Sequence, residues 1–177
     1  VVNIALEHRL KRLVYVSTAS CFHLGTKEHP GAEDQPFDGY KYHLDYIDSK
    51  FKAQEFVLRA TRERGLPAVV VNPTFMFGEY DSLPSSGKMI VAAYKGELPG
   101  YPSGGKNFVY AKDVACACVN AITKGRVGEC YIAGNSNLSY HELFEKMSPV
   151  LGVKPPRIKL PDLAILLVGY LGTLIGK

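Results

Sequence analysis

The sequence has 177 residues, of which 46% are hydrophobic and 21% are charged. This composition is typical of one globular domain with room for a small lobe, and it excludes disordered and fibrous proteins. The 21 basic and 17 acidic residues leave a net charge of +4, which is too small and too scattered to favour nucleic acid as a partner. The densest basic cluster, Arg59, Arg62 and Arg64, is expected on alternate sides of a helix.

Cysteine usage and hydropathy bear on the setting of the protein. The four cysteines include no C-x-x-C pair, and a chain of this length needs no disulfides, so we expect a reducing, cytoplasmic environment and no metal site. The first residues show no basic n-region, so we expect no secretory signal. Its most apolar stretch, Leu163–Ile175, has thirteen residues, against the about 20 that a membrane span needs.

The first half of the sequence predicts alternating helices and strands. Val1–Leu10 is typical of the body of a helix without a capping residue, which suggests a missing upstream portion. Arg12–Ser17 is a short apolar run typical of a buried strand, and Gly25–Gly39 has the composition of a loop. Apolar residues recur at helical spacing over Tyr42–Arg64, and Gly65 just after them predicts the end of this helix. Ala68–Val71 predicts a second buried strand. This order is typical of a parallel sheet covered by helices, the α/β class.

The second half has a weaker pattern. Ser139 and Glu142 form a capping box that predicts the start of a helix over Tyr140–Leu151. The Pro155-Pro156 pair leads into an extended segment or a last strand before the apolar tail. The remaining predictions are a helix over Lys88–Tyr94, a strand over Asn107–Ala111, a helix over Val114–Ile122 and a strand over Glu129–Ala133.

Two motifs are interpreted as structural. Gly100–Lys106 has the spacing of a phosphate-binding loop, but Asn107 follows where that loop has Ser or Thr, and a strand is predicted where its helix would begin. Cys116 and Cys118 lie two residues apart on a predicted helix and therefore diverge. We expect them to pack in the core and to bind no metal.

The spacing of one tyrosine and one lysine suggests a pair of residues that could transfer protons. Tyr46 and Lys50 are four residues apart on a predicted helix, so the ammonium can lie beside the phenol. A cation beside a phenol favours the phenolate and makes it a usable proton donor and acceptor near neutral pH. Ser17 and Thr18 end a buried strand, and the carboxyl ends of parallel strands line ligand crevices. Asn72–Gly78 ends the next strand in a turn stiffened by proline, which would form a second wall.

These residues resemble the extended short-chain dehydrogenase/reductases, the NAD-dependent epimerase/dehydratase family, and in particular the branch of dihydroflavonol 4-reductases and 3β-hydroxysteroid dehydrogenases. Five stretches match the motifs of the family in order: Leu13–Gly25, Tyr46–Lys50, Asn72–Gly78, Asn107–Asp113 and Gly128–Gly134. The resemblance implies the C-terminal part of a Rossmann-type doubly wound parallel sheet with a small α/β substrate-binding lobe. Residues 1–80 would complete the dinucleotide-binding domain, and residues 81–177 would form the lobe, with about 107–134 returning to the main sheet.

The resemblance also implies roles for individual residues. Tyr46 would be the catalytic acid/base, Lys50 would bind the nicotinamide ribose and support the tyrosine, and Thr18, with Ser17 beside it, would orient the substrate oxygen. The cofactor, NADP or NAD, would contact Tyr46, Lys50, Ser17, Pro73 and Thr74. The substrate would contact Ser20, Phe22, Phe75 and Phe77, while Asp113 would cap its helix.

The sequence also departs from the pattern of the family. Asn72 stands where the family usually has Arg, Phe22 and Phe77 stand where it usually has Tyr, and Tyr110 stands where it often has His. These departures bear on the substrate and leave the reacting groups in place. The glycine-rich loop that seats the cofactor pyrophosphate does not occur in this sequence. We therefore expect the 177 residues alone to be inactive.

The resulting hypothesis is an NAD(P)-dependent oxidoreductase that interconverts a secondary alcohol and a ketone, with a small-molecule substrate and, by analogy, a homodimeric assembly. An apolar wall without an arginine favours this reaction over the alternative, a nucleotide-sugar epimerase or dehydratase. A second alternative is a non-catalytic redox sensor or scaffold. The joint presence of Tyr46, Lys50 and Thr18 argues against it.

Overall fold

The computed structural model describes residues 1–82 and 85–175. The chain divides into two compact units. Unit 1 consists of Val1–Phe77 and Phe108–Asn135, and unit 2 consists of Gly78–Asn107 and Ser136–Lys177. Unit 1 contains the two strands and the helix whose residues are predicted to take part in chemistry.

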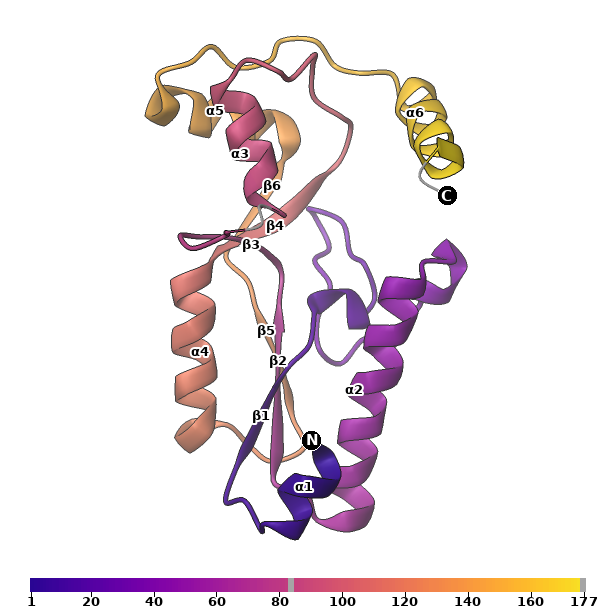
Figure 1. The fold of residues 1–177 in the computed structure, drawn as a ribbon, viewed down its shortest axis with the longest axis vertical. Coiled ribbons are helices and arrows are strands. Elements are labelled where there is room, and N and C mark those ends of the chain that lie inside the picture. Colours follow the sequence, from indigo (N-terminus) through magenta and orange to yellow (C-terminus); the bar gives the residue numbers. More distant parts are fainter. Residues whose placement is uncertain (83–84, 176–177) are drawn as a thin grey trace. The chain divides into compact units, whose positions relative to one another are not determined.

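Unit 1 is built on a parallel sheet in the order β1-β2-β5 (Figure 1). The strands are β1 (Leu13–Val16), β2 (Ala68–Pro73) and β5 (Cys130–Ala133). In the register, Val16 lies beside Val71, and Pro73 lies beside Ala133. All six residues of the central strand β2 are buried. The ends of β1 and β2 therefore meet at one edge of the sheet.

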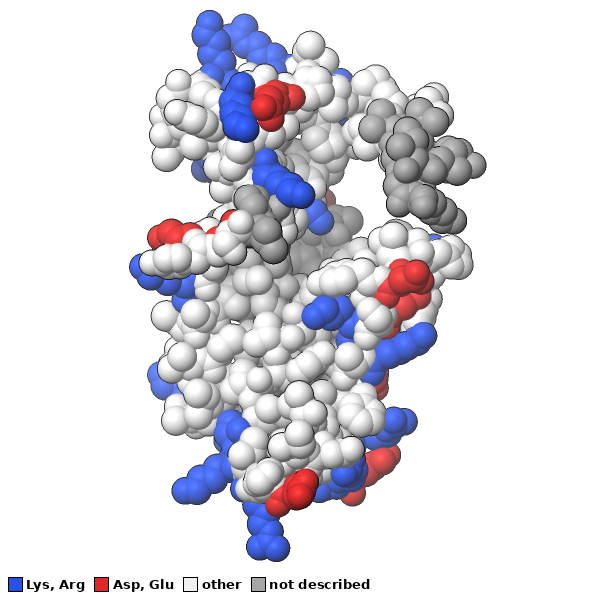
Figure 2. Space-filling model, in the orientation of Figure 1, with Lys and Arg blue, Asp and Glu red and all other residues white. Residues whose placement is uncertain are grey.

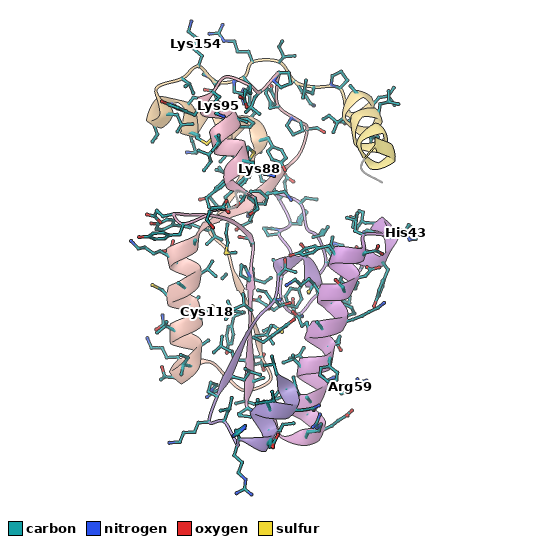
Figure 3. The ribbon with its side chains drawn as sticks, in the orientation of Figure 1. His43, Arg59, Lys88, Lys95, Cys118 and Lys154 are labelled. Atoms are coloured by element: carbon teal, nitrogen blue, oxygen red, sulfur yellow. The ribbon has the colours of Figure 1, made fainter. Side chains whose placement is uncertain are left out.

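Helices cover both faces of this sheet (Figure 1). They are α1 (Val2–Glu7), α2 (Asp45–Arg64) and α4 (Ala111–Lys124). Side chains alternate along β2, so Val70 packs in one cluster with α1 and α2, whereas Val69 packs with Ala121 of α4 on the other face. In Figure 3, Arg59 and Cys118 mark α2 and α4. These layers confirm the predicted α/β fold.

Two predictions about α4 are wrong. Asp113 lies in the first turn of α4, but the N-cap is Tyr110 and no side chain caps the helix. The negative charge of Asp113 therefore favours α4 through the helix dipole and not through a capping hydrogen bond. Cys116 is exposed and not packed in the core, because it lies on the face of α4 turned away from the sheet, whereas Cys118 is half-buried.

Helix α2 begins later than the periodicity predicts. The 3₁₀ helix η2 (Gly39–Tyr42) precedes it, and His43 adopts a left-handed conformation with φ of 50°. The helix ends as predicted at Gly65, whose φ of 70° suits a residue without a side chain. Tyr46 consequently lies in the first turn of α2.

The segment after β2 is a strand and not the predicted turn. β3 (Phe75–Phe77) pairs in parallel with β4 (Gly105–Tyr110), which lies between β3 and β6 (Ser136–Ser139) in a second sheet. Phe75 pairs with Phe108, and Phe77 pairs with Tyr110. Pairing with β4 therefore fixes the backbone conformation of Phe75–Phe77.

Unit 2 also contains the helices α3 (Gly87–Tyr94), α5 (Tyr140–Leu151) and α6 (Asp162–Ile175). The predicted capping box of Ser139 and Glu142 is present at the start of α5. The segment after Pro156 stays extended and forms an isolated bridge between Tyr101 and Lys159. Among the described residues, no helix has both the length and the apolar character that crossing a bilayer requires.

On the face drawn in Figure 2, basic and acidic side chains are interspersed over unit 1. Within the arginine cluster of α2, Arg62 lies 4.0 Å from the carboxylate of Glu55, and Arg64 donates a hydrogen bond to Asn3. Arg59 lies over the ring of Phe56. Each of these arginines thus has a partner within the unit.

Candidate active site

The first component of the site is one face of α2. Tyr46 and Lys50 lie one turn apart, and the Lys50 Nζ is 5.9 Å from the centroid of the Tyr46 ring. Tyr46 is 62% exposed, so its phenol is accessible to a ligand. No acidic side chain among the described residues forms an ion pair with Lys50. This face of α2 therefore presents the Tyr46 phenol beside a Lys50 ammonium that forms no ion pair with a described acidic side chain.

The second component is the turn that follows β1. Thr18 is the N-cap of the 3₁₀ helix η1 (Ala19–Cys21), and its Oγ1 accepts a hydrogen bond from the Ser20 amide at 3.3 Å. The same hydroxyl donates to Ser20 Oγ at 3.4 Å. Ser17 is buried, with its Oγ 3.4 Å from Cys21 Sγ. The structure thus directs both predicted hydroxyl groups toward η1.

A buried amide joins these two components. Asn72, in β2, donates from Nδ2 to the main-chain oxygen of Thr18 at 2.9 Å and to Gln54 Oε1 at 2.6 Å. Gln54 lies on α2 one turn beyond Lys50. Through Asn72, the turn with Thr18 is tied to the helix that carries Tyr46.

The charge of Lys50 also reaches this turn. Burial raises the pKa of the Cys21 thiol, while hydrogen bonds from the turn and the nearby Lys50 ammonium act in the opposite direction. Lys50 therefore lies within electrostatic range of η1 as well as of Tyr46. This placement supports a common site for α2 and the end of β1.

Gln54 and the structural role of Asn72 are not among the features predicted from the sequence. A signal for Gln54 was present, because it continues the four-residue spacing of Tyr46 and Lys50. In the sequence, Asn72 stands out only as a departure from the family motif. Its partners lie far from it in sequence, and only the packing of α2 on the sheet brings them together.

The segment after β2 is the one predicted to form a second wall of the site. Pro73 is buried at the end of β2, and the Thr74 amide donates to the Ala133 oxygen at 3.1 Å. The rings of Phe75 and Phe77 lie 5.4 Å apart, centroid to centroid, and each is 5.6 Å from that of Phe108. These three rings form an apolar cluster within unit 1.

Phe22, which is predicted to contact the substrate, is buried beside a cavity. It is 7% exposed and lines a cavity of about 490 Å³. This cavity also includes Phe37, Gln54, Glu55 and Cys130, but not Tyr46, Lys50 or Thr18. Ser20 differs from Phe22 in bonding directly to Thr18. Across the described part of the chain, no group of three His, Cys, Asp or Glu side chains could hold a metal ion.

Comparison with known proteins gives a consistent family likeness. The family model described as NAD dependent epimerase/dehydratase matches residues 1–134. The chain is 30% identical over 146 residues to tetraketide alpha-pyrone reductase 2 of Arabidopsis thaliana, an alignment that covers 78% of this chain and 46% of the relative.

Solved structures agree with this likeness. The crystal structure of gox2253 is 33% identical, with a TM-score of 0.87, over 99% of this chain and 55% of that one. A nucleoside-diphosphate-sugar epimerase from Pseudomonas aeruginosa is 27% identical, with a TM-score of 0.85, over 98% of this chain and 57% of that one. The chain spans about half the length of the relatives that it matches.

Proposed function

Because this chain belongs to the NAD-dependent epimerase/dehydratase family, we propose that it carries the catalytic groups of an NAD(P)-dependent oxidoreductase that interconverts a secondary alcohol and a ketone. The observation that carries the proposal is the accessible phenol of Tyr46 beside the Lys50 ammonium, on a helix tied through Asn72 to the turn with Thr18. A binding scaffold would need none of these three reactive groups.

The residues present fit the nicotinamide end of the cofactor. The Lys50 ammonium would hold the ribose hydroxyl groups, and Pro73 and Thr74 would border the nicotinamide ring. When bound, a nicotinamide supplies or accepts a hydride. The site would be completed by a longer polypeptide, because the sequence holds no glycine-rich loop for the pyrophosphate. Unit 1 would then bind the cofactor, and unit 2 would contribute to the substrate lobe.

Proton transfer falls to Tyr46 in this proposal. During reduction its phenol donates a proton to the substrate oxygen, and the Lys50 ammonium stabilises the phenolate that remains. Thr18, with Ser17 and Ser20 beside it, would orient the same oxygen through a hydrogen bond, after its hydroxyl turns away from Ser20. Oxidation uses the same groups in the reverse direction.

The apolar cluster favours a ketone or alcohol substrate. Phe75 and Phe77 pack with Phe108, and such rings suit an apolar substrate better than a charged sugar nucleotide. The second candidate, epimerisation or dehydration of a nucleotide sugar, has the likeness to the Pseudomonas epimerase in its favour. Turnover with ketones and with nucleotide sugars, measured in parallel on the longest natural form of the protein, separates the two.

The decisive variant is Tyr46→Phe. Removing the proton donor should lower kcat by about 10²- to 10⁴-fold, while the affinity for the cofactor, measured by fluorescence titration, stays nearly unchanged. Tyr42→Phe is a matched control, because Lys41 lies 5.1 Å from the centroid of the Tyr42 ring but outside the proposed site. Equal activities of Tyr46→Phe and the unaltered protein would rule out the mechanism.

A further inference from the structure

We propose that Gln54 and Asn72 are positioning residues, which form an amide clamp that holds the turn carrying Thr18 against the helix carrying Tyr46 and Lys50. This inference rests on the proposed function and extends it to two residues that need touch neither substrate nor cofactor. The clamp is defined as the side chains of Gln54 and Asn72 with the main-chain oxygen of Thr18.

The clamp is a branched set of hydrogen bonds. Both Nδ2 hydrogens of Asn72 are used, one on the Thr18 oxygen at 2.9 Å and one on Gln54 Oε1 at 2.6 Å. The Thr18 oxygen also accepts the Cys21 amide at 3.1 Å, which closes the 3₁₀ turn. One side chain thereby fixes η1 and α2 relative to β2.

Burial makes this arrangement demanding. Asn72 is 0% exposed and Gln54 is 2% exposed, and Asn72 Oδ1 has no hydrogen-bond partner among the described residues. A buried polar group costs free energy unless it is paired, and the unpaired Oδ1 adds to that cost. The preceding residues of β2, Val69 to Val71, are apolar and equally buried. An apolar side chain at position 72 would fill the core at a lower cost, so packing alone does not account for the amides.

The positions of the residues that the clamp connects explain the two buried amide side chains better than packing does. Gln54 lies one helical turn from Lys50 and two from Tyr46, while Asn72 holds the residue proposed to orient the substrate oxygen. A displacement of about 1 Å between reacting groups can cost about 10²-fold in rate. Loosening the clamp should therefore reduce kcat more than it reduces binding.

The test compares variants in the longest natural form of the protein. Gln54→Met removes the acceptor at similar volume, whereas Gln54→Glu keeps an acceptor oxygen in the same place. Asn72→Asp is nearly isosteric but removes both donated hydrogens. Val70→Ala is the control, because Val70 lies in β2, is 0% exposed and packs in the apolar core, and its side chain makes none of the hydrogen bonds of the clamp.

The expected result is a separation of kcat from KM. Gln54→Met and Asn72→Asp should lower kcat about 10- to 100-fold with little change in KM, and Gln54→Glu should restore most of the rate. Val70→Ala should lower the melting temperature and leave kcat unchanged. A Gln54→Met protein with normal kcat, or a Gln54→Glu protein as slow as Gln54→Met, would overturn the clamp, and this pair decides the matter if Asn72→Asp does not fold.

A second readout does not depend on activity. Cys21 is 1% exposed and its amide bonds to the Thr18 oxygen, so a loosened clamp should speed alkylation of Cys21, followed by mass spectrometry, in Asn72→Asp and Gln54→Met but not in Val70→Ala. Unchanged Cys21 alkylation in both variants would overturn the clamp. If the unaltered protein shows no turnover with any nicotinamide cofactor, the proposed function fails, and alkylation still decides whether the clamp holds the turn.

Discussion

At the scale of single residues, Cys130 shows how burial changes the chemistry of a side chain. Its pKa is raised to about 12, first by burial and then by the negative groups around it, which include Cys21, Glu55 and Glu129. The thiol stays neutral in the folded protein at a pH where a cysteine in the unfolded chain has ionised. Folding and ionisation of Cys130 therefore oppose each other in alkaline solution.

This opposition predicts a pH dependence of stability. The contribution of Cys130 is fully present below the unfolded pKa of about 8.5, and it is lost as the pH rises toward 12, because the unfolded state binds fewer protons than the folded state. The free energy of unfolding, measured with urea from pH 7 to 10.5, should fall more steeply in the unaltered protein than in Cys130→Ala. Parallel curves for the two proteins would contradict the prediction.

The residues of the candidate site differ in how far a sequence can predict them. Tyr46 and Lys50 are neighbours on one helix, so their spacing alone predicts their proximity. The partners of Asn72 lie 18 and 54 positions away in the chain. Their hydrogen bonds depend on how α2 packs on the sheet, which no local pattern specifies.

At the scale of the element, α3 and α5 offer a comparison of helix starts. Ser139 caps α5 and forms a complete capping box with Glu142, whereas Ser86, the N-cap of α3, makes no side-chain capping bond. Ser139→Ala should therefore lower the free energy of unfolding by about 1 kcal/mol, and Ser86→Ala should change it little. Urea unfolding of both variants checks this, and equal effects would show that the box adds no stability.

The same comparison explains which elements the sequence could predict. The capping box and the terminal Gly65 are local signals, and both are present where they were predicted. β3 has only three residues and follows Pro73, so it is too short to show a period. Its pairing with β4, some thirty residues later, is what makes it a strand.

At the scale of the whole molecule, β1 is one of the two edge strands of the sheet of unit 1. β1 is at one end of the order β1-β2-β5, and relatives of this chain are about twice as long. The amide of Leu13 donates to the oxygen of Pro67, the residue before β2, and the amide of Ser17 donates to the oxygen of Val71 in β2. Because amides alternate in direction along a strand, those of Val14 and Val16 point to the opposite side.

This alternation predicts a residue-by-residue pattern of hydrogen exchange in β1. In the 177-residue chain, the amides of Val14 and Val16 should exchange much faster than those of Leu13 and Ser17, because no strand among the described residues pairs with that side of β1. In a natural form as long as the relatives, a further parallel strand would slow Val14 and Val16 and leave Leu13 and Ser17 nearly unchanged. Exchange measured by NMR resolves the four amides. Equal protection of all four in the 177-residue chain would show that β1 is covered on both sides without any additional polypeptide, and the proposal that a longer chain completes this sheet would then lose its structural basis.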